Sequence, residues 1–413
     1  MKFLCILFLV FWMMKGASAQ WIQQNSGTVN TLISVYFVNS QNGVAVGDSG
    51  TILKTSNGGS TWTKIISGTN ETLYSTSFAN DTIGFAVGHT TTQVSTILKT
   101  VDGGASWFNS SLGAQWGFES VSFIDTQNGY AAGGGGSMTW DNNGSVFKTT
   151  DGGATWNEVF NRGFYCFNTS FSTPDTGFVL TYHVLPPNYD VWYEISKTTN
   201  GGISWANHVI GNINETIVRS VFFTDLDRGY ASCGNGDILE TTDGGITWTK
   251  VSTVTNKYLR SVFFTNASTG FAVGDNEILK TRDGGATWGH QEMPLSGNLF
   301  SVYFPNADTG YSVGDSGLII KTTNGGMLSL DEEITSSNYL KLYPNPTDDK
   351  ITIETSLKGD DYLWILNANG VQKIEKQISE PITEIDIRDF PKGVYLVQLR
   401  NRVGTKTAKL LIN

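Results

Sequence analysis

The chain is poor in the residues that build most catalytic and metal sites. Its 413 residues include four His, three Cys and nine Pro. The Cys-x-x-Cys and His-Glu-x-x-His motifs and the phosphate-binding loop are absent, so the sequence contains no recognisable zinc, redox or nucleotide motif. The few His residues are scattered and form no Ser-His-Asp pattern. We therefore expect no catalytic residue, no metal and no other cofactor.

Long hydrophobic runs are also missing. The apolar run over residues 3–14 is too short for a permanent membrane anchor. Lys2 precedes the run and Ala17-Ser18-Ala19 follows it, which is the pattern of a cleavable signal peptide over residues 1–19. The sequence therefore predicts export and a mature protein without a transmembrane anchor.

Cysteine and basic residues are scarce in the mature chain. Once Cys5 leaves with the leader, Cys166 and Cys233 remain; they either pair or are two small buried side chains, and two cysteines make no disulfide framework. Of the 27 Lys and Arg residues, Lys2 and Lys15 lie in the leader, which leaves 25 against 37 Asp and Glu. An acidic surface repels phosphate backbones, so we do not expect a nucleic-acid partner.

Glycine and aromatic residues, in contrast, are abundant. There are 47 Gly, and Phe, Trp and Tyr make up 12% of the chain. This mixture suits short strands joined by tight turns and argues against a helical bundle. A Gly-Gly turn followed by Thr/Ser-Trp recurs every 40 to 49 residues. The residue before each Gly-Gly pair is Asn57, Asp102, Asp151, Asn200, Asp243, Asp283 or Asn324.

The repeat has the length of one four-stranded propeller blade. Each copy holds a strand such as residues 33–37, a second at 44–47, a third at 51–55 and a fourth that begins at the Trp. Seven copies predict an all-β, seven-bladed β-propeller over residues 20–328. The seventh copy lacks its Trp, and Trp21 has the right spacing to supply it. We therefore expect residues 21–24 to pair with the third strand of the last blade and close the ring.

The Gly-Gly turn resembles the Asp-box (BNR) repeat of sialidases, sortilin-type receptors and some glucanases. Its Asp or Asn can accept backbone N–H bonds across the turn, and its Gly residues permit positive φ. Each box offers a single such side chain, and three of the seven are neutral Asn, whereas hard cations need several converging oxygens. We interpret the seven box residues as structural.

The whole blade pattern is more specific than the box alone. Ser-Val-x-Phe, then Gly-Phe/Tyr-Ala-Val-Gly-Asp, then Ile-Leu-Lys-Thr-x-Asp-Gly-Gly-x-Thr-Trp resembles the photosystem II stability/assembly-factor-like propellers over about residues 21–326. The resemblance implies a binding or assembly factor rather than an enzyme, and it implies the fold without implying photosynthesis.

The loops that could bind a ligand are expected on one face. Antiparallel pairing places the second-to-third turns and the links between blades on the face opposite the boxes; we call it the insertion face. These turns are enlarged in three consecutive blades, at residues 89–95, 133–145 and 182–194. Aromatic residues in or beside them are Trp116, Trp140, Tyr182, Tyr189 and Trp192. The rings could stack on sugars or peptides, or could pack the loops onto the propeller.

Arginines accompany these aromatic residues. Arg162, Arg219 and Arg260 lie at blade links or at first-strand starts of the insertion face. Planar guanidinium groups suit the capture of carboxylates. Sialidases use three arginines for this purpose, and the photosystem-type propellers have an Arg-lined patch on one face. The Phe/Tyr-Arg-Ile-Pro segment of sialidases is absent here, which makes a sialidase the least favoured alternative.

A glycoside hydrolase with two carboxylates is the broader enzymatic alternative. Asp48, Asp275 and Asp315 lie at matching second-strand ends, although Asp-Ser-Gly at 48–50 and 315–317 is also good turn chemistry. The leading hypothesis is a secreted or surface propeller that binds an extracellular glycan, peptide or protein.

The last part of the chain differs from the repeat. Residues 329–338 form a polar linker. Residues 339–413 predict a small Ig-like β-sandwich with strands at 350–354, 362–366, 383–387, 394–399 and 407–412. Its landmarks are Pro344-Asn345-Pro346, Asn369-Gly370, Gly393-Val394-Tyr395 and the closing Leu410-Leu411-Ile412-Asn413. Together they resemble the type A sorting domain of the type IX (Por) secretion system. The resemblance implies a gram-negative host, contact with the secretion machinery through residues 339–413, and a released or surface-attached protein.

Overall fold

The computed structural model describes residues 21–89, 95–110, 117–135, 143–161, 165–185, 190–210, 217–251, 253–326, 340–355, 361–367, 372–378, 380, 382–401 and 404–412. These residues form two compact units, one within Ala19–Met327 and one within Leu328–Asn413. The predicted signal peptide and linker lie outside the described residues. In the described ranges, no helix is long and apolar enough to cross a membrane.

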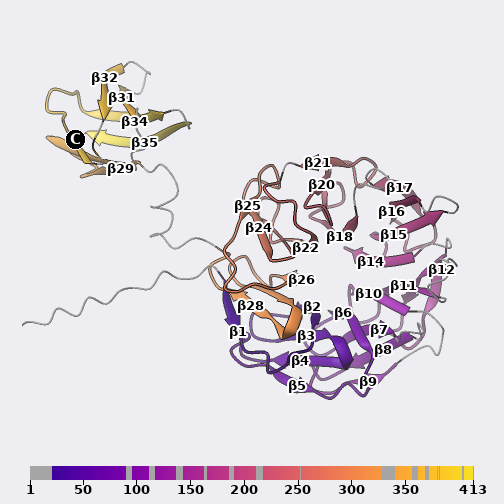
Figure 1. The fold of residues 1–413 in the computed structure, drawn as a ribbon. Coiled ribbons are helices and arrows are strands. Elements are labelled where there is room, and N and C mark those ends of the chain that lie inside the picture. Colours follow the sequence, from indigo (N-terminus) through magenta and orange to yellow (C-terminus); the bar gives the residue numbers. More distant parts are fainter. Residues whose placement is uncertain are drawn as a thin grey trace, which may run out of the picture. The chain divides into compact units, whose positions relative to one another are not determined.

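The larger unit is a seven-bladed β-propeller, which confirms the predicted fold. Seven antiparallel four-stranded sheets surround a central axis, and each runs outward from its inner strand (Figure 1). The inner strands of blades one to seven are β2 (Leu32–Phe37), β6 (Thr72–Phe78), β10 (Gly117–Phe123), β14 (Tyr165–Phe171), β18 (Val218–Phe223), β22 (Leu259–Phe264) and β26 (Leu299–Tyr303). The second strands are β3 (Gly43–Gly47), β7 (Gly84–His89), β11 (Gly129–Gly135), β15 (Gly177–Leu185), β19 (Gly229–Cys233), β23 (Gly270–Gly274) and β27 (Gly310–Gly314).

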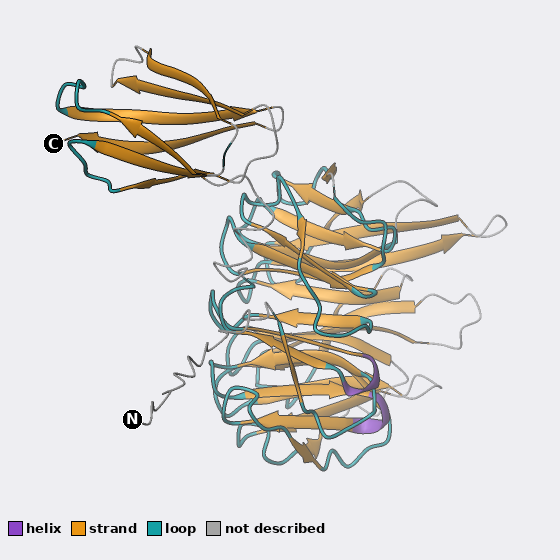
Figure 2. Ribbon diagram, turned by 60° about the vertical axis from the view of Figure 1, so that its left-hand side comes forward, coloured by secondary structure: helices purple, strands orange, loops and turns teal. Residues whose placement is uncertain are grey.

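The outer half of each blade completes its sheet. The third strands are β4 (Thr51–Thr55), β8 (Ser95–Thr100), β12 (Asn143–Thr149), β16 (Asp190–Thr198), β20 (Ile238–Thr241), β24 (Glu277–Thr281) and β28 (Ile319–Thr322). The outermost strands are β5 (Thr63–Ile65), β9 (Phe108–Asn109), β13 (Asn157–Asn161), β17 (Ala206–Ile210), β21 (Thr249–Val251), β25 (Gly289–His290) and β1 (Ile22–Gln24). Two short 3-10 helices, η1 (Asp48–Gly50) and η2 (Asp315–Gly317), form second-to-third turns. Figure 2 shows both at the end of the propeller toward which the longest hairpin projects.

Aromatic stacks between neighbouring blades form the core. Phe37 of blade one stacks on Tyr311 of blade seven with ring centres 3.7 Å apart, and Phe123 stacks on Phe85 at 3.8 Å. A box Trp then meets each stack edge-on, as Trp62 does against Phe37 at 5.9 Å. Edge-to-face and offset-stacked contacts are the geometries that aromatic rings prefer. The repeated aromatic positions therefore serve as the seams between blades.

The box residues are hydrogen-bonded within their own turns. Thr55 donates its hydroxyl to Asn57 Oδ1 at 3.0 Å, and the Thr61 N–H donates to the same oxygen at 2.9 Å. A threonine makes the same bond to Asp102, Asp151, Asn200, Asp243, Asp283 and Asn324. Gly58 and Gly59 have φ of 62° and 79°, a region that glycine enters without steric cost. The side-chain oxygens of the box residues thus accept hydrogen bonds within their own turns.

Lysines on third strands connect the boxes of blades one, three, four and seven to the blade before each of them. Lys99 Nζ donates to Gly152 O at 2.6 Å, and Lys321 Nζ donates to Gly58 O at the same distance. Lys99 also lies 5.5 Å from the ring centre of Phe85, within cation–π range. Because Lys321 belongs to blade seven and Gly58 to blade one, this bond helps to close the ring.

The closing strand is the one that the sequence predicts. β1 pairs antiparallel with β28, with Ile22 opposite Lys321 and Gln24 opposite Ile319. Trp21 is 0% exposed and meets Phe271 and Phe304 edge-on, with ring centres 6.1 and 5.9 Å away. The first strand of the propeller therefore completes its last blade.

The smaller unit is a β-sandwich. One sheet holds β29 (Leu340–Tyr343), β30 (Lys350–Thr355) and β33 (Ile382–Asp386). The other holds β32 (Gln372–Ile378), β31 (Asp361–Asn367), β34 (Gly393–Asn401) and β35 (Gly404–Ile412). Ile351 and Ile353 of the first sheet share a buried cluster with Leu363 and Val397 of the second. The unit thus has a hydrophobic core of its own.

Candidate functional site

Every inner strand of the propeller contains a β-bulge at the same place. In blade one the register shifts between Leu32 and Ser34, and the other six blades shift at the equivalent position. The bulged residues, which we call the mouth residues, are Ile33, Tyr74, Glu119, Phe167, Arg219, Arg260 and Phe300. A bulge leaves its residue outside the ladder and re-aims the side chain.

The mouth residues belong to the insertion face. Leu32, at the start of β2, pairs with Gly47, which directly precedes the second-to-third turn. The inner strands form the ring closest to the propeller axis (Figure 1). The seven bulges therefore surround the mouth of the propeller at that face. Their charges are not evenly distributed, because Glu119 is on blade three and both arginines are on blades five and six.

The basic side of the mouth is organised around Tyr258. Arg219 Nε donates to the Tyr258 hydroxyl, and its guanidinium lies 5.0 Å from the ring centre. Arg260 lies over the same ring at 4.7 Å and over Phe300 at 4.6 Å. Arg260 Nε also donates to Asp275 Oδ1 at 2.8 Å. Arg219 is exposed and forms no ion pair with a described residue. Two guanidinium groups thus share one aromatic platform, and among the described residues only that of Arg260 is paired with a carboxylate.

The acidic side of the mouth is organised around Glu119. Its Oε1 accepts a hydrogen bond from the Tyr165 hydroxyl and lies 3.1 Å from His89 Nε2. His89 in turn stacks on Tyr74, with ring centres 4.6 Å apart. Burial raises the pKa of Tyr165, and the negative charge of Glu119 raises it further. Tyr165 therefore stays protonated and keeps donating to the carboxylate.

The long hairpin of blade four separates two predicted ligand-binding residues. In the β15–β16 ladder Tyr182 pairs with Tyr193, and the next pair is His183 with Trp192. Successive residues of a strand point to opposite faces of the sheet. Tyr182 faces the mouth, 5.2 Å from the Tyr165 ring and 6.0 Å from Phe167. Trp192 stacks on His183 at 4.8 Å on the other face, so the two rings do not form one surface.

The structure thus brings together three of the eight predicted ligand-binding residues, Tyr182, Arg219 and Arg260. Trp116, Trp140, Tyr189 and Arg162 lie outside the described residues. The enlarged turns also differ from the expected loops. In blade four the ladder between the second and third strands extends as far as the pair Leu185 and Asp190. In blade three it extends as far as the pair Gly135 and Asn143. In-register pairing extends the hairpins because it satisfies backbone groups that a loop would leave open.

Sequence reasoning missed Glu119, Tyr74, Tyr165 and Tyr258. For Tyr74 and Glu119 the only signal is the position immediately before the Ser that six of the seven first strands share. Tyr165 begins the first strand of blade four, and Tyr258 lies in a blade link. The position before the shared Ser is occupied by apolar, aromatic, acidic and basic residues in turn, so a repeat alignment gives it no consensus. Only the strand register shows that this position is a β-bulge and therefore that its side chain lies at the mouth.

The predicted carboxylates occupy different surroundings. Asp48 and Asp315 begin η1 and η2, and Asp48 Oδ1 accepts a hydrogen bond from the Thr72 hydroxyl at 3.3 Å. Asp275 is paired with Arg260. Within the described ranges there is no group of three or more His, Cys, Asp and Glu that could hold a metal. Cys166 and Cys233 form no disulfide with each other, and burial raises the pKa of both thiols.

The predicted sorting-motif residues make hydrogen bonds that hold parts of the smaller unit in place, including its last strand, β35. Asn345, between Pro344 and Pro346, donates from Nδ2 to Lys409 O at 2.7 Å and accepts from the Leu411 N–H at 2.9 Å. A single side chain thus holds the edge of β35. Tyr395 is 3% exposed and donates to Pro391 O at 2.8 Å. Gly393 has φ of 149°, within the region that disfavours other residues.

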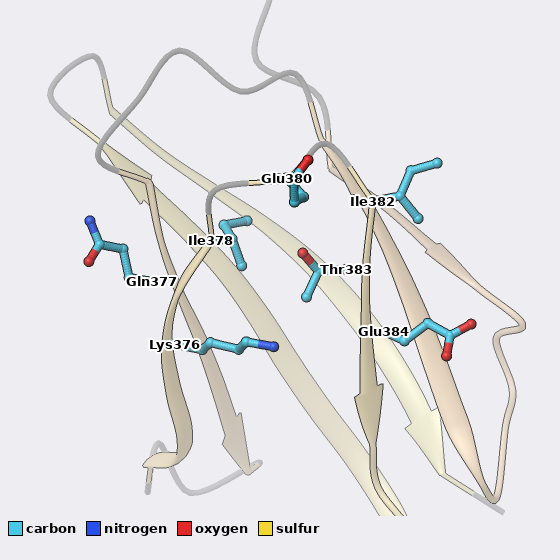
Figure 3. Close-up of a pocket in the computed structure, with 7 residues that line it drawn as sticks. All are labelled: Lys376, Gln377, Ile378, Glu380, Ile382, Thr383 and Glu384. Carbon is cyan, nitrogen blue, oxygen red and sulfur yellow. The ribbon is translucent and has the colours of Figure 1, made fainter.

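A small hollow also lies in this unit. It has a volume of about 270 Å³ and is bordered by β32 and β33 (Figure 3). Its charged side chains are Lys376, Glu380 and Glu384, and Glu384 also lies 3.7 Å from Lys350. β32 and β33 each end one of the two sheets. The hollow is therefore the open margin between the sheets of the sandwich.

Two family profiles match the chain. Residues 341–413 match the secretion system C-terminal sorting domain. Residues 13–159 and 247–341 match the photosynthesis system II assembly factor YCF48. Both matches confirm the resemblances found in the sequence. The sorting domain indicates export by the type IX system and a secreted or outer-membrane-surface location. No curated protein matches the sequence significantly.

Several solved structures are similar in fold to this chain. A structure described as YCF48 bound to D1 peptide is 20% identical with a TM-score of 0.60, and covers 74% of this chain and 98% of its own. YCF48 from Cyanidioschyzon merolae is 18% identical with a TM-score of 0.59, and covers 73% and 98%. The GH74 xyloglucanase from Xanthomonas campestris is 11% identical with a TM-score of 0.57, and covers 82% and 60%.

Proposed function

The chain belongs to the family of the photosynthesis system II assembly factor YCF48, and we propose that it is an exported member whose mouth binds carboxylate-bearing segments of peptides or proteins. The observation that carries this proposal is the exposed guanidinium of Arg219. It is oriented by its bond to Tyr258 and has no anionic partner among the described residues. A planar guanidinium held in this way is ready to receive a carboxylate in a bidentate contact.

Arg260 supports the same function. Its stacking between Tyr258 and Phe300 fixes the guanidinium plane, and Asp275 engages its Nε. The remaining donors of the group can still reach a ligand, since guanidinium has five N–H donors. A peptide bound to YCF48 in a structure of the same fold is consistent with this use of the propeller.

A carbohydrate-active enzyme is the alternative function, because the GH74 xyloglucanase has a similar fold. Glycoside hydrolysis generally needs two carboxylates that flank the bond to be broken. The seven mouth residues include one carboxylate, Glu119, and the nearby Asp275 is neutralised by Arg260. We therefore favour binding over hydrolysis.

Affinity selection tests the proposal. The mature chain is incubated with a soluble library of synthetic heptapeptides, each present both as the free acid and as the C-terminal amide, and bound peptides are identified by mass spectrometry. We expect enrichment of peptides with Asp, Glu or an accessible C-terminal carboxylate. Arg219→Gln should weaken their binding about tenfold, because a hydrogen bond to a charged group contributes about 1.5 kcal/mol or more.

Arg282→Gln is the matched control, because it removes the same charge from the box face. It should leave binding unchanged. Selection of no peptide above background, or equal binding by wild type and Arg219→Gln, would contradict the proposal.

A further inference from the structure

Glu119 presents one bonded and one unbonded carboxylate oxygen at the mouth. The contacts to His89 and Tyr165 both involve Oε1, and Oε2 has no hydrogen-bond partner among the described residues. The side chain is 20% exposed. Bonds to Oε1 fix the orientation of the group, so Oε2 is a pre-positioned acceptor that faces an accessible space.

Tyrosine rings gather around this carboxylate. Tyr165 donates to Glu119, Tyr182 lies 5.2 Å from Tyr165, and Tyr74 stacks on the His89 ring that contacts Glu119. The electrostatic influences on Tyr165 come, after burial, from Glu119, Tyr182 and Tyr74, which raise its pKa together. The four side chains therefore form one cluster. A carboxylate beside aromatic rings attracts cations, because both kinds of group interact favourably with a positive charge.

We propose that Glu119, Tyr74, Tyr165 and Tyr182 form a cation subsite that receives the ammonium or guanidinium group of a bound peptide. This inference rests on the proposed function and specifies its ligand. A Lys or Arg side chain, or an N-terminal amine, supplies the cation. Glu119 Oε2 accepts its hydrogen bond while the tyrosine rings contact its apolar stem.

The arrangement of charges around the ring determines which peptides fit. Glu119 is on blade three and Arg260 on blade six, three blades apart, which is the largest separation in a ring of seven. Tyr182 belongs to blade four, which lies between the blade of Glu119 and the blade of Arg219. The mouth is therefore dipolar. It favours an extended peptide that carries a basic group at one end and a carboxylate at the other.

Part of this subsite lies where the chain departs from its family profile. The match covers residues 13–159 and 247–341, and so leaves out Tyr165 and Tyr182. The long hairpin of blade four, which supplies Tyr182, falls in the same unmatched stretch. A ligand preference built from these residues is accordingly a property of this chain.

The heptapeptide selection described above also tests the subsite, with the mature chain carrying Glu119→Gln or Tyr182→Leu. Wild type should enrich peptides that contain both a basic residue and a carboxylate. Glu119→Gln keeps acceptors for His89 and Tyr165 but removes the charge; it should lower the affinity for the basic peptides about tenfold, as expected for a lost charge-assisted contact. Tyr182→Leu keeps the charge and should weaken the same peptides at least about threefold.

Asp81→Asn, which removes the same charge from an exposed position beside the box turn of Gly103, is the control and should have no effect. Retained acidic preference without any basic enrichment would overturn the cation subsite and leave the proposed function standing. Basic enrichment that is unchanged in Glu119→Gln would also overturn it. If wild type shows no preference for carboxylate-bearing peptides, the proposed function itself is contradicted. The melting temperature of each variant is also measured. A value equal to that of wild type shows that the variant is folded and that any loss is a loss of recognition.

Discussion

At the scale of single residues, the partners of a side chain distinguish structural positions from the positions that we propose for recognition. Asp151 is typical of the first kind, because Thr149 and Thr155 both donate to its carboxylate. Arg219 is typical of the second, because its charge faces the mouth without an anion among the described residues. The role that we assign to a charged side chain thus depends on whether its bonding capacity is already used.

The box aspartates make the stability of the propeller depend on pH. Hydrogen bonds, first from the Thr155 hydroxyl and then from its N–H, lower the pKa of Asp151 to about 2, and equivalent bonds from Thr247 lower that of Asp243 to about 2. The unfolded value is near 3.9. Because the folded pKa is the lower one, the carboxylate stabilises the fold above about pH 4, and this stabilisation disappears as the pH falls toward 2.

We predict that Asp151→Asn combined with Asp243→Asn reduces the loss of stability between pH 4 and pH 2. Asn already occupies the same place at Asn57, where it accepts the same N–H bond, so the turn should persist. The measurement is the urea midpoint at a series of pH values. The exposed Asp81→Asn is the control and should behave like wild type. A double variant with the wild-type acid profile would contradict this account.

At the scale of elements, closure of the ring depends on the three residues of β1 and on Trp21. Trp21 is fully buried, and its Nε1 has no hydrogen-bond partner among the described residues. Its contribution is therefore the packing of its ring against Phe271 and Phe304. A strand this short gains most of its stability from such packing rather than from the few ladder bonds.

Trp21→Ala is predicted to lower the free energy of unfolding of the propeller by about 3–5 kcal/mol, the usual cost of removing a buried aromatic side chain. Trp21→Phe should cost less, because it keeps a ring and loses no hydrogen bond. Ile22→Ala in the same strand should cost under about 1 kcal/mol, since Ile22 is 50% exposed. Urea unfolding followed by intrinsic fluorescence measures all three. Equal effects of Trp21→Ala and Ile22→Ala would refute the closing role.

Elements were predictable where their pattern repeats and not where it varies. The spacing from Trp21 to Ser34 equals that from Trp62 to Ser75, which identified the closing strand before any geometry was known. In the sorting unit, β32 escaped prediction because its sequence Gln-Lys-Ile-Glu-Lys-Gln-Ile has few apolar residues. β29 escaped because it has only four residues. A strand with few apolar residues or few residues in all is recognised only when the structure shows its pairing with a neighbouring strand.

At the scale of the whole molecule, the sequence predicted two units with separate tasks, and the site only in part. Arg219 and Arg260 could be placed on the insertion face from topology alone. Their shared platform, Tyr258, could not, because it lies in a blade link without a repeat position. Tyr182 and Trp192 are ten residues apart and looked equivalent. Only the ladder register shows that they face opposite sides of their hairpin.

Export and binding then fit together in one chain. The sorting domain matched at residues 341–413 indicates export of the propeller, and on our proposal its mouth would then bind extracellular peptides or proteins. The central claim is that Arg219 receives a carboxylate at this mouth.

The most direct test compares one peptide from the selection in two forms, as the free acid and as the C-terminal amide. The peptide is chosen so that its C-terminus is its sole carboxylate. Dissociation constants of both forms are measured on wild type and on Arg219→Gln. We expect wild type to bind the free acid about tenfold more tightly, as for a lost hydrogen bond between charged groups, and the ratio to fall close to one in Arg219→Gln. A ratio near one on wild type, or an equal preference for the acid in both proteins, would contradict the account.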